Sequence, residues 1–244
     1  MSTIDKVLVF DIWGDYAHFR RGYTTTSPLT YPFPTRTALS GMMAAILGLP
    51  RDSYYELFGK DKSAFAIQII NPIKKIRIIQ NLIDTKHGYT PWEIQIKGQA
   101  PRTQISFEYV KNPKYRVYVW SKECFNELKS LIEEHKSKYT LYLGISECIS
   151  NFEYIGVGNV ERKIANGVEI EISTIIKNEG VIEIKPEEGK KYGKIKMPGF
   201  MNKKRVVQEF IEVIYEENGK TIKITRGEYY KIKNLNENVN VSFF

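Results

Sequence analysis

The sequence has few of the side chains that bind metal ions or form covalent cross-links. It contains 2 cysteines and 3 histidines among 244 residues. Cys124 and Cys148 do not form a CxxC pair, and no histidine lies at metal-ligand spacing. We therefore expect no zinc site and no cofactor. Two isolated cysteines without a signal-peptide pattern are typical of a protein in a reducing cytoplasm.

Long hydrophobic runs are also missing. The uncharged stretch at residues 37–50 is shorter than the about 20 residues that a membrane-spanning helix needs, and it contains Ser40, Gly41 and Gly48. We therefore expect no membrane partner. A chain of 244 residues with 42% hydrophobic and 26% charged residues is typical of a globular protein with a substantial core, in one large domain or two small ones.

Acidic residues are scarce in the first half of the chain. Residues 1–120 contain 16 Lys and Arg but 9 Asp and Glu, a net charge of +7, whereas the second half supplies the remaining +1 of the total of +8. A basic N-terminal half favours a polyanionic partner such as a nucleic acid. Charge alone leaves a second interpretation open, a lysine-rich surface with no specific partner.

The most informative stretch is residues 7–50, which read as a strand, a loop and a helix. Residues 7–13 are β-branched and aromatic and end at Gly14, which predicts a buried strand. The loop at residues 15–31 combines guanidinium groups, hydroxyls and aromatic rings, which suits a phosphodiester chain with unstacked bases. The expected RNA contacts in this loop are Arg20, Arg21, Tyr23, Thr24 and Thr25.

The helix predicted after this loop has two faces. Thr35 or Thr37 can act as its N-cap, and Gly48 with Pro50 ends it. One face carries large apolar residues, and the other carries small residues, including Ser40 and Gly41. Two interpretations of the small face remain open: another backbone or sheet packs closely on it, or RNA approaches near the start of the helix. We expect RNA contacts there from Arg36, Ser40 and Gly41.

A long basic excursion follows. Residues 80–101 show no periodicity, and residues 71–104 carry six basic and two acidic residues. Loops of this length inside a compact domain are usually functional, although a plain surface loop remains the alternative. We predict an extended, thumb-like hairpin that folds over RNA. Its expected RNA-binding residues are Tyr89, Trp92, Lys97 and Arg102.

The remaining pattern predicts an α+β fold. Strands are expected at residues 103–110 and 115–120 and a helix at residues 123–135, so the N-terminal order is compatible with a ferredoxin-like or RRM-like sheet with a thumb-like insertion at about residues 71–104. From residue 139 onward the chain reads as β, with hairpins expected at Asn166-Gly167 and Asn218-Gly219. We predict an RRM-like domain at residues 1–138 and a smaller antiparallel β-rich region at residues 139–244.

Several runs resemble the CRISPR-associated Cas5 family, closest to its type I-B members. The most specific runs are F-D-I-W-G-D-Y-A-H-F-R-R from Phe10 and Y-T-T-T-S-P-L-T-Y-P-F-P-T-R-T-A-L-S-G from Tyr23. A further match is R-T-Q-I-S-F-E-Y-V-K-N-P-K-Y-R-V-Y-V-W from Arg102, and weaker ones are Y-L-G-I-S-E from Tyr142 and R-V-V-Q-E-F-I-E-V-I-Y from Arg205. The resemblance thus spans most of the chain.

This resemblance implies an RNA-binding structural subunit of a type I surveillance (Cascade) complex in antiviral defence. Such a subunit grips the 5′ handle of the guide RNA and caps the filament of backbone subunits beside the large subunit. Target DNA is then a partner through the complex. The thumb of the family lies over bound RNA.

The alternative is a metal-independent endoribonuclease that processes repeat RNA, as the type I-C branch does with a tyrosine, a lysine and a histidine. His18, Tyr23 and Arg20, or else His87, Tyr89 and Lys97, offer an acid, a base and a cation for this chemistry. Neither set has a spacing that marks catalysis, and the Lys-His pair of that branch has no clear counterpart in this sequence. We therefore favour binding over cutting, with no catalytic residues.

Overall fold

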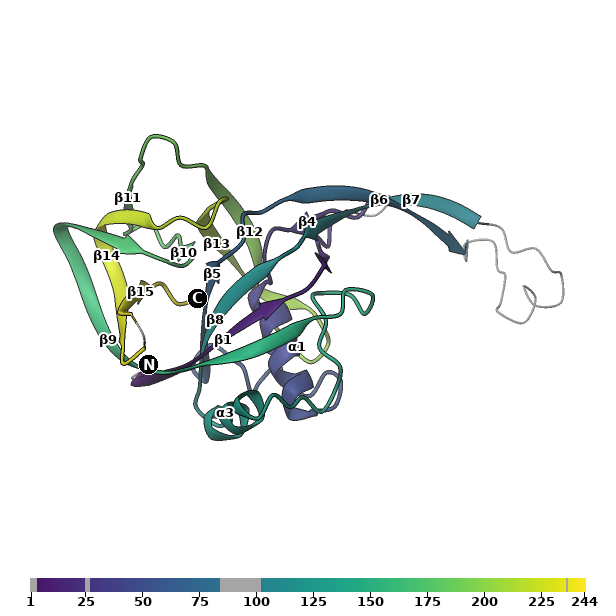
Figure 1. Ribbon diagram of the computed structural model, residues 1–244, viewed down its shortest axis with the longest axis horizontal. Helices are drawn as coiled ribbons and strands as arrows, with labels where there is room; N and C mark the ends of the chain where they lie inside the picture. The colour runs from purple at the N-terminus through teal and green to yellow at the C-terminus, as the bar shows by residue number, and fades with distance from the viewer. Residues whose placement is uncertain (1–3, 25–26, 84–101, 236) are drawn as a thin grey trace.

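The computed structural model describes residues 4–24, 27–83, 102–235 and 237–244. These residues are mostly antiparallel β-structure, curled around a core, with two α-helices close together on one side (Figure 1). A long two-stranded arm projects from the body on the opposite side from the chain ends. The arm, the loop at its base and helix α1 are the parts that position the candidate site.

The main sheet of the described residues has seven strands in the order β11-β14-β9-β1-β8-β5, with β15 paired to β14. Neighbouring strands pair antiparallel throughout. The central strand β1 is buried on both faces, which explains the uninterrupted hydrophobic run at residues 7–10. The strands are β1 (Lys6–Trp13), β5 (Ser63–Ile69), β8 (Lys114–Ser121), β9 (Asn151–Ile172), β11 (Glu183–Lys185), β14 (Ile222–Lys233) and β15 (Val239–Val241).

Strand β9 joins the two halves of the chain in one sheet. Its first part pairs with β1, from Lys6↔Asn159 to Trp13↔Asn151, and its second part pairs with β14. The expected domain boundary at residue 138 lies before β9, and strands from both sides of this residue belong to the main sheet.

Helix α1 (Arg36–Leu47) and helix α3 (Phe125–Glu133) cover one face of this sheet and contact each other. The hydroxyl of Thr35, one of the two expected N-caps, accepts the N–H of Ala38 and caps α1, and Gly48 ends the helix with φ 72°, as the sequence predicts. The core stripe of α1 packs on the sheet, and each fully buried side chain of this kind contributes about 1.5–3 kcal/mol. Its buried apolar residues are Leu39, Met42, Met43, Ala44, Ile46 and Leu47.

In chain order, the two helices and the main-sheet strands of the N-terminal region are β1, α1, β5, β8, α3 and β9, and the sheet order of these strands is β9-β1-β8-β5. Between β5 and β8, strands β6 (Lys75–Ile83) and β7 (Arg102–Lys111) pair antiparallel and form the arm seen in Figure 1. A turn at Asn112 (φ 49°) joins β7 to β8, but the two strands belong to different sheets.

A second, three-stranded sheet packs against α1 from the C-terminal region. It has the order β10-β13-β12, formed by β10 (Ile176–Lys177), β13 (Val207–Glu216) and β12 (Tyr192–Met201). The turn at Asn218-Gly219 connects β13 to β14, which lie in different sheets, so the hairpin predicted there is wrong. The two strands that this short turn connects pair with strands of different sheets, and not with each other.

The hairpin predicted at Asn166-Gly167 is also wrong. Strand β9 runs through both residues, Asn166 pairs with Arg226, and Gly167 has φ 77° beside a register shift opposite β14. An Asn-Gly pair supplies a positive φ to a tight turn or to a bulge equally well. Here the long partner strand β14 keeps β9 extended, so the pair produces an irregularity in one strand.

Candidate nucleic-acid interface

The basic loop near the N-terminus lies between short strands that fix both of its ends. Strand β2 (Tyr16–Ala17) pairs with β7, and β3 (Phe19–Arg20) pairs with β4 (Thr30–Tyr31). Because side chains alternate along a strand, the buried Phe19 places Arg20 on the outside. Arg20 donates to the carbonyl of Thr24 at 3.3 Å.

Thr24 organises the turn of this loop. Its hydroxyl donates to the carbonyl of Arg21 at 2.8 Å and accepts the N–H of Leu29 at 3.2 Å. The hydroxyl of Thr24 is therefore occupied by the loop itself. Thr24 can therefore contact RNA, as expected, only through atoms that do not take part in these two bonds. Thr25 lies outside the described residues.

Arg21 is held in place without a carboxylate partner. Its Nε donates to the carbonyl of Thr30 at 3.2 Å, its Nη1 donates to the Tyr23 hydroxyl at 3.0 Å, and its guanidinium lies 5.5 Å from the centre of the Tyr31 ring. Tyr23 is 71% exposed. In the described part of the chain neither Arg20 nor Arg21 forms a salt bridge, so the structure orients two cations without a directly bonded carboxylate next to an exposed ring.

The base of the arm is bonded to this loop. The N–H of Glu108 on β7 donates to the carbonyl of Pro28, and its Oε1 accepts the N–H of Thr30 at 3.3 Å and the Nζ of Lys75 at 2.9 Å. Burial acts to raise the pKa of the Glu108 carboxyl, but the Lys75 ammonium and the Thr30 N–H outweigh it and hold the pKa below its usual range. Loop and arm therefore form one surface.

His18 supports this junction from inside. It is 1% exposed, its Nδ1 lies 2.7 Å from the carbonyl oxygen of Glu108, and its ring packs between Phe107 and Tyr109. Burial lowers the pKa of His18 below its ordinary value, so the imidazole is neutral at pH 7. The structure does not bring this ring to the surface beside Tyr23. His87, Tyr89, Trp92 and Lys97 lie outside the described residues.

Arg36 and Ser40 do not lie on an exposed surface near the start of α1, as their expected RNA contacts require. Arg36 is 1% exposed, and its guanidinium donates to the carbonyls of Phe58 at 3.0 Å and Ser63 at 2.8 Å. Burial lowers its pKa to about 9, which leaves it protonated at neutral pH. Ser40 is also buried, and its hydroxyl donates to the carbonyl of Arg36. The expected phosphate contact of Arg36 is therefore corrected to a structural role, because the fold itself uses its donors.

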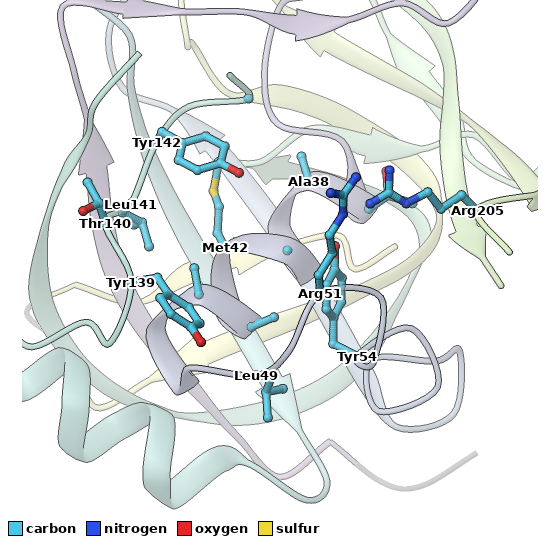
Figure 2. Close-up of a pocket in the computed structure, with 15 residues that line it drawn as sticks. Ala38, Met42, Leu49, Arg51, Tyr54, Tyr139, Thr140, Leu141, Tyr142 and Arg205 are labelled. Carbon is cyan, nitrogen blue, oxygen red and sulfur yellow. The ribbon is translucent and has the colours of Figure 1, made fainter. Parts of the chain in front are cut away.

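The small-residue face of α1 borders a hollow of about 730 Å³, which we call the α1 hollow (Figure 2). Its floor is that face of the helix, including the half-buried Gly41, and Tyr54, Tyr139 and Tyr142 stand around it. An added Cβ on Gly41 would lie 3.3 Å from the Tyr54 hydroxyl and near no backbone. Around Gly41 the face thus meets a side chain and open space, whereas Ser40 and Ala44 on the same helix are buried.

Two arginines that sequence reasoning missed border the α1 hollow. Figure 2 shows Arg51 and Arg205 on one side and Tyr139 and Tyr142 on the other. Of these four residues, only Tyr142 and Arg205 carry a sequence signal, since the two weaker family matches begin there. Those matches assign no role to either residue. Residues 139–145, expected as a strand, are irregular apart from one bridge between Tyr142 and Ile149. The remaining expected contact, Arg102, is exposed where β7 begins on the arm.

Metal and membrane features can be assessed only within the described ranges. There, no three His, Cys, Asp or Glu side chains gather as a metal-binding group would. Within the same ranges, no helix has both the length and the hydropathy needed to pass through a bilayer. Both cysteines are free.

The curled antiparallel fold and the basic loop point to a particular class of proteins. Residues 7–210 match the family model described as CRISPR-associated protein (Cas_Cas5). Because this match covers most of the chain, the protein belongs to the Cas5 family. A search of curated proteins gives no match.

Two solved structures share the fold. A chain of a "CRISPR RNA-guided surveillance complex" is 14% identical with a TM-score of 0.52, and the alignment covers 89% of this chain and 91% of that one. A CRISPR protein from Archaeoglobus fulgidus is 16% identical with a TM-score of 0.57, and the alignment covers 97% and 99%. At these identities the likeness concerns the fold.

Proposed function

We propose that the protein is a non-catalytic, RNA-binding subunit of a type I CRISPR surveillance (Cascade) complex, closest to type I-B. In this role it grips the 5′ handle of the guide RNA, caps the backbone filament beside the large subunit, and meets target DNA through the complex in the cytoplasm during antiviral defence. Membership of the Cas5 family and the fold shared with a chain of an RNA-guided surveillance complex support this role.

The observation that carries the proposal is the bonded junction between the basic loop and the arm. Glu108 and Lys75 fix the loop against the arm, so that Arg20 and Arg21 are oriented at the arm's base. Guanidinium groups that are fixed in advance lose little entropy when they bind phosphates. RNA lying on this junction would meet both cations and the exposed ring of Tyr23 together.

We also propose that the N-terminal region is a ferredoxin-like, RRM-like unit. The chain order of two strand-helix pairs around β5 and β8, with the sheet order β9-β1-β8-β5, supports this assignment. In this view the arm formed by β6 and β7 is the thumb-like insertion into such a unit.

Salt dependence tests the RNA contacts of the loop. The double variant Arg20→Ala/Arg21→Ala should bind single-stranded handle RNA more weakly, and the slope of log K against log salt should fall by about 0.7 for each lost phosphate contact. The matched control is Arg162→Ala/Arg226→Ala, which removes two exposed arginines from ion pairs on the far strands β9 and β14. Equal slopes for the two double variants would refute the proposed contacts.

Assembly tests the arm. Ile79 and Ile83 are 67% and 51% exposed on the same face of β6. Replacing both by serine should leave the fold intact and reduce co-purification with the backbone subunit and guide RNA. Ile164 and Val168 on β9 are equally exposed, and their replacement by serine is the control. Normal assembly of the arm variant, judged by native mass, would refute a role of this face in capping the filament.

The absence of catalysis is part of the proposal. It is supported by the burial of His18, whose neutral ring lies inside the junction of loop and arm and is 1% exposed. Repeat RNA incubated with the protein in EDTA should remain uncut under conditions where the two bind. A specific cut within the repeat would establish the metal-independent endoribonuclease alternative instead.

A further inference from the structure

We propose that the α1 hollow holds one nucleotide of a bound single-stranded RNA, with its base above the α1 floor among the tyrosines and a phosphate at Arg51 and Arg205. The inference rests on the proposed function and adds a specific binding site to it. Three features of the hollow lead to this ligand class: its flat floor, its aromatic walls and its excess of positive charge.

Part of the floor is flat because the helix presents Ala38, Gly41 and Ala45 there, whereas Met42 lines the side towards Tyr142. Gly41 has an ordinary helical conformation, so the backbone does not require glycine, and glycine costs about 1 kcal/mol relative to alanine inside a helix. At these three small residues a planar ring can approach the helix closely. The volume of about 730 Å³ is within the range of sites for small organic ligands.

The walls are tyrosines with accessible rings. Tyr139 and Tyr142 are 55% and 44% exposed although both border the hollow, and Tyr54 stands across the floor from them in Figure 2. Bases stack on tyrosine rings, and the tyrosine hydroxyls can bond to base edges. An unstacked RNA base therefore matches both the shape and the chemistry of these walls.

The mouth carries two guanidinium groups and one carboxylate. Arg205 Nε lies 2.8 Å from Asp52 Oδ1, and Arg51 Nε lies 3.7 Å from Asp52 Oδ2. The hydrogen bond from Arg205, with a second from the Tyr55 hydroxyl, holds the pKa of Asp52 below its usual range, so the carboxyl is ionised. One positive charge is left over, and a phosphate accepted by both arginines would balance it.

The backbone at this mouth is strained. Asp52 and Arg205, which bond to each other, have positive φ values of 64° and 59°. Left-handed conformations at residues other than glycine are concentrated at ligand clamps and active sites. The two residues come from opposite halves of the chain, so the pairing holds the loop between β12 and β13 over α1.

RNA suits the hollow better than a protein segment does. Its lining residues come from α1 and from loops, so it offers no strand edge to which a peptide backbone could add. The wall that carries Tyr142 is bonded to the basic loop, since the N–H of His18 donates to the carbonyl of Leu143 at 3.0 Å. An RNA strand leaving Arg20 and Arg21 would follow this wall to the hollow.

Filling the hollow tests the base site. The probe is a short single-stranded RNA that carries the fluorescent base 2-aminopurine at successive positions, because its emission falls when it stacks on an aromatic ring. Gly41→Leu should abolish the quenching at one position and weaken binding by about fivefold or more. The control Ser130→Leu adds the same side chain to the exposed face of α3. Urea unfolding shows whether each variant is folded.

Removing charge tests the phosphate site. Arg51→Ala and Arg205→Ala should each lower the salt slope by up to about 0.7, and Lys204→Ala, which removes the same charge from the loop of Arg205 without bordering the hollow, should change it less. One outcome is that the Arg20→Ala/Arg21→Ala variant weakens RNA binding while every hollow variant keeps the 2-aminopurine quenching and the salt slope of the unaltered protein. In that case the inference fails and the proposed function stands. If folded hollow variants bind RNA normally but lose assembly with the other subunits, the hollow receives protein, which also overturns the inference. If the unaltered protein shows no RNA binding, the proposed function itself fails.

Discussion

Replacing Arg36 separates a structural role from an RNA-binding role. Its guanidinium lies at the start of α1 and donates to the carbonyls of Phe58 and Ser63 and to the Ser63 hydroxyl. It also lies 4.0 Å from the centre of the Phe200 ring on β12 and 5.1 Å from that of Phe65 on β5. The side chain thus connects α1, the main sheet and the second sheet, and Arg36→Ala should destabilise the whole fold.

The size of the effect follows from these contacts. Four hydrogen bonds from a buried cation are lost, including a long one of 3.5 Å to the Gly59 carbonyl, and each bond of this kind is worth about 1.5–3 kcal/mol, although the losses do not add. The Phe58 carbonyl keeps the Ser63 hydroxyl as a donor, which reduces the loss. Truncation also leaves a cavity between the two aromatic rings. We expect Arg36→Ala to lower the free energy of unfolding by about 3–5 kcal/mol, a large part of the about 5–15 kcal/mol typical of a domain.

Urea unfolding of the free protein measures this quantity. Arg36→Met, which fills the space but donates no hydrogen bond, should fall between the natural protein and Arg36→Ala. RNA affinity and its salt slope should be unchanged in Arg36→Met under conditions where the variant is folded. A loss of stability below about 1 kcal/mol, together with a salt slope lowered by about 0.7, would refute the structural role and restore Arg36 as a phosphate contact.

Three further outcomes follow from single contacts. Burial alone would raise the pKa of the Glu216 carboxyl, but backbone N–H donors around it lower the pKa below the unfolded value of about 4.3. The ionised carboxyl therefore stabilises the fold above that pH, and this stabilisation is lost as the pH falls below it. Glu216→Gln should therefore lower the urea midpoint of unfolding at pH 7, and near pH 3 the midpoints of the variant and the natural protein should become similar. Gly144 has φ 96°, and an added Cβ would lie 2.1 Å from the His18 carbonyl oxygen, whereas Gly180 has φ 73° with open space around it. Gly144→Ala should cost about 3 kcal/mol or more and Gly180→Ala about 1–2 kcal/mol, and equal losses would contradict the close approach. An NMR titration of His18 should show a pKa below the ordinary value of about 6.5, and a normal value would mean that the ring is solvated.

Local sequence signals determined the elements whose residues interact mainly with near neighbours. The sequence predicts strand β1, an N-cap of α1 at Thr35 or Thr37, the end of α1 at Gly48 and the helix α3, because capping and periodicity depend on residues a few positions apart. The resemblance to the Cas5 family, carried by contiguous motifs, was also visible in the sequence and is confirmed by the family match.

Partners distant in the chain decided the rest. An Asn-Gly pair at residue 166 fits a turn or a bulge, and only the presence of β14 beside β9 selects the bulge. Arginine in a basic loop and arginine at a helix start look alike in sequence, yet Arg21 is half-buried and bonds within its own loop, while Arg36 is buried and donates to carbonyls of residues 58 and 63. The α1 hollow combines residues near positions 40, 52, 140 and 205, which no local pattern relates. Whether a side chain is buried or paired with an opposite charge depends on contacts between residues far apart in the sequence. The chemistry of these side chains was therefore decided by the packing of the two halves of the chain.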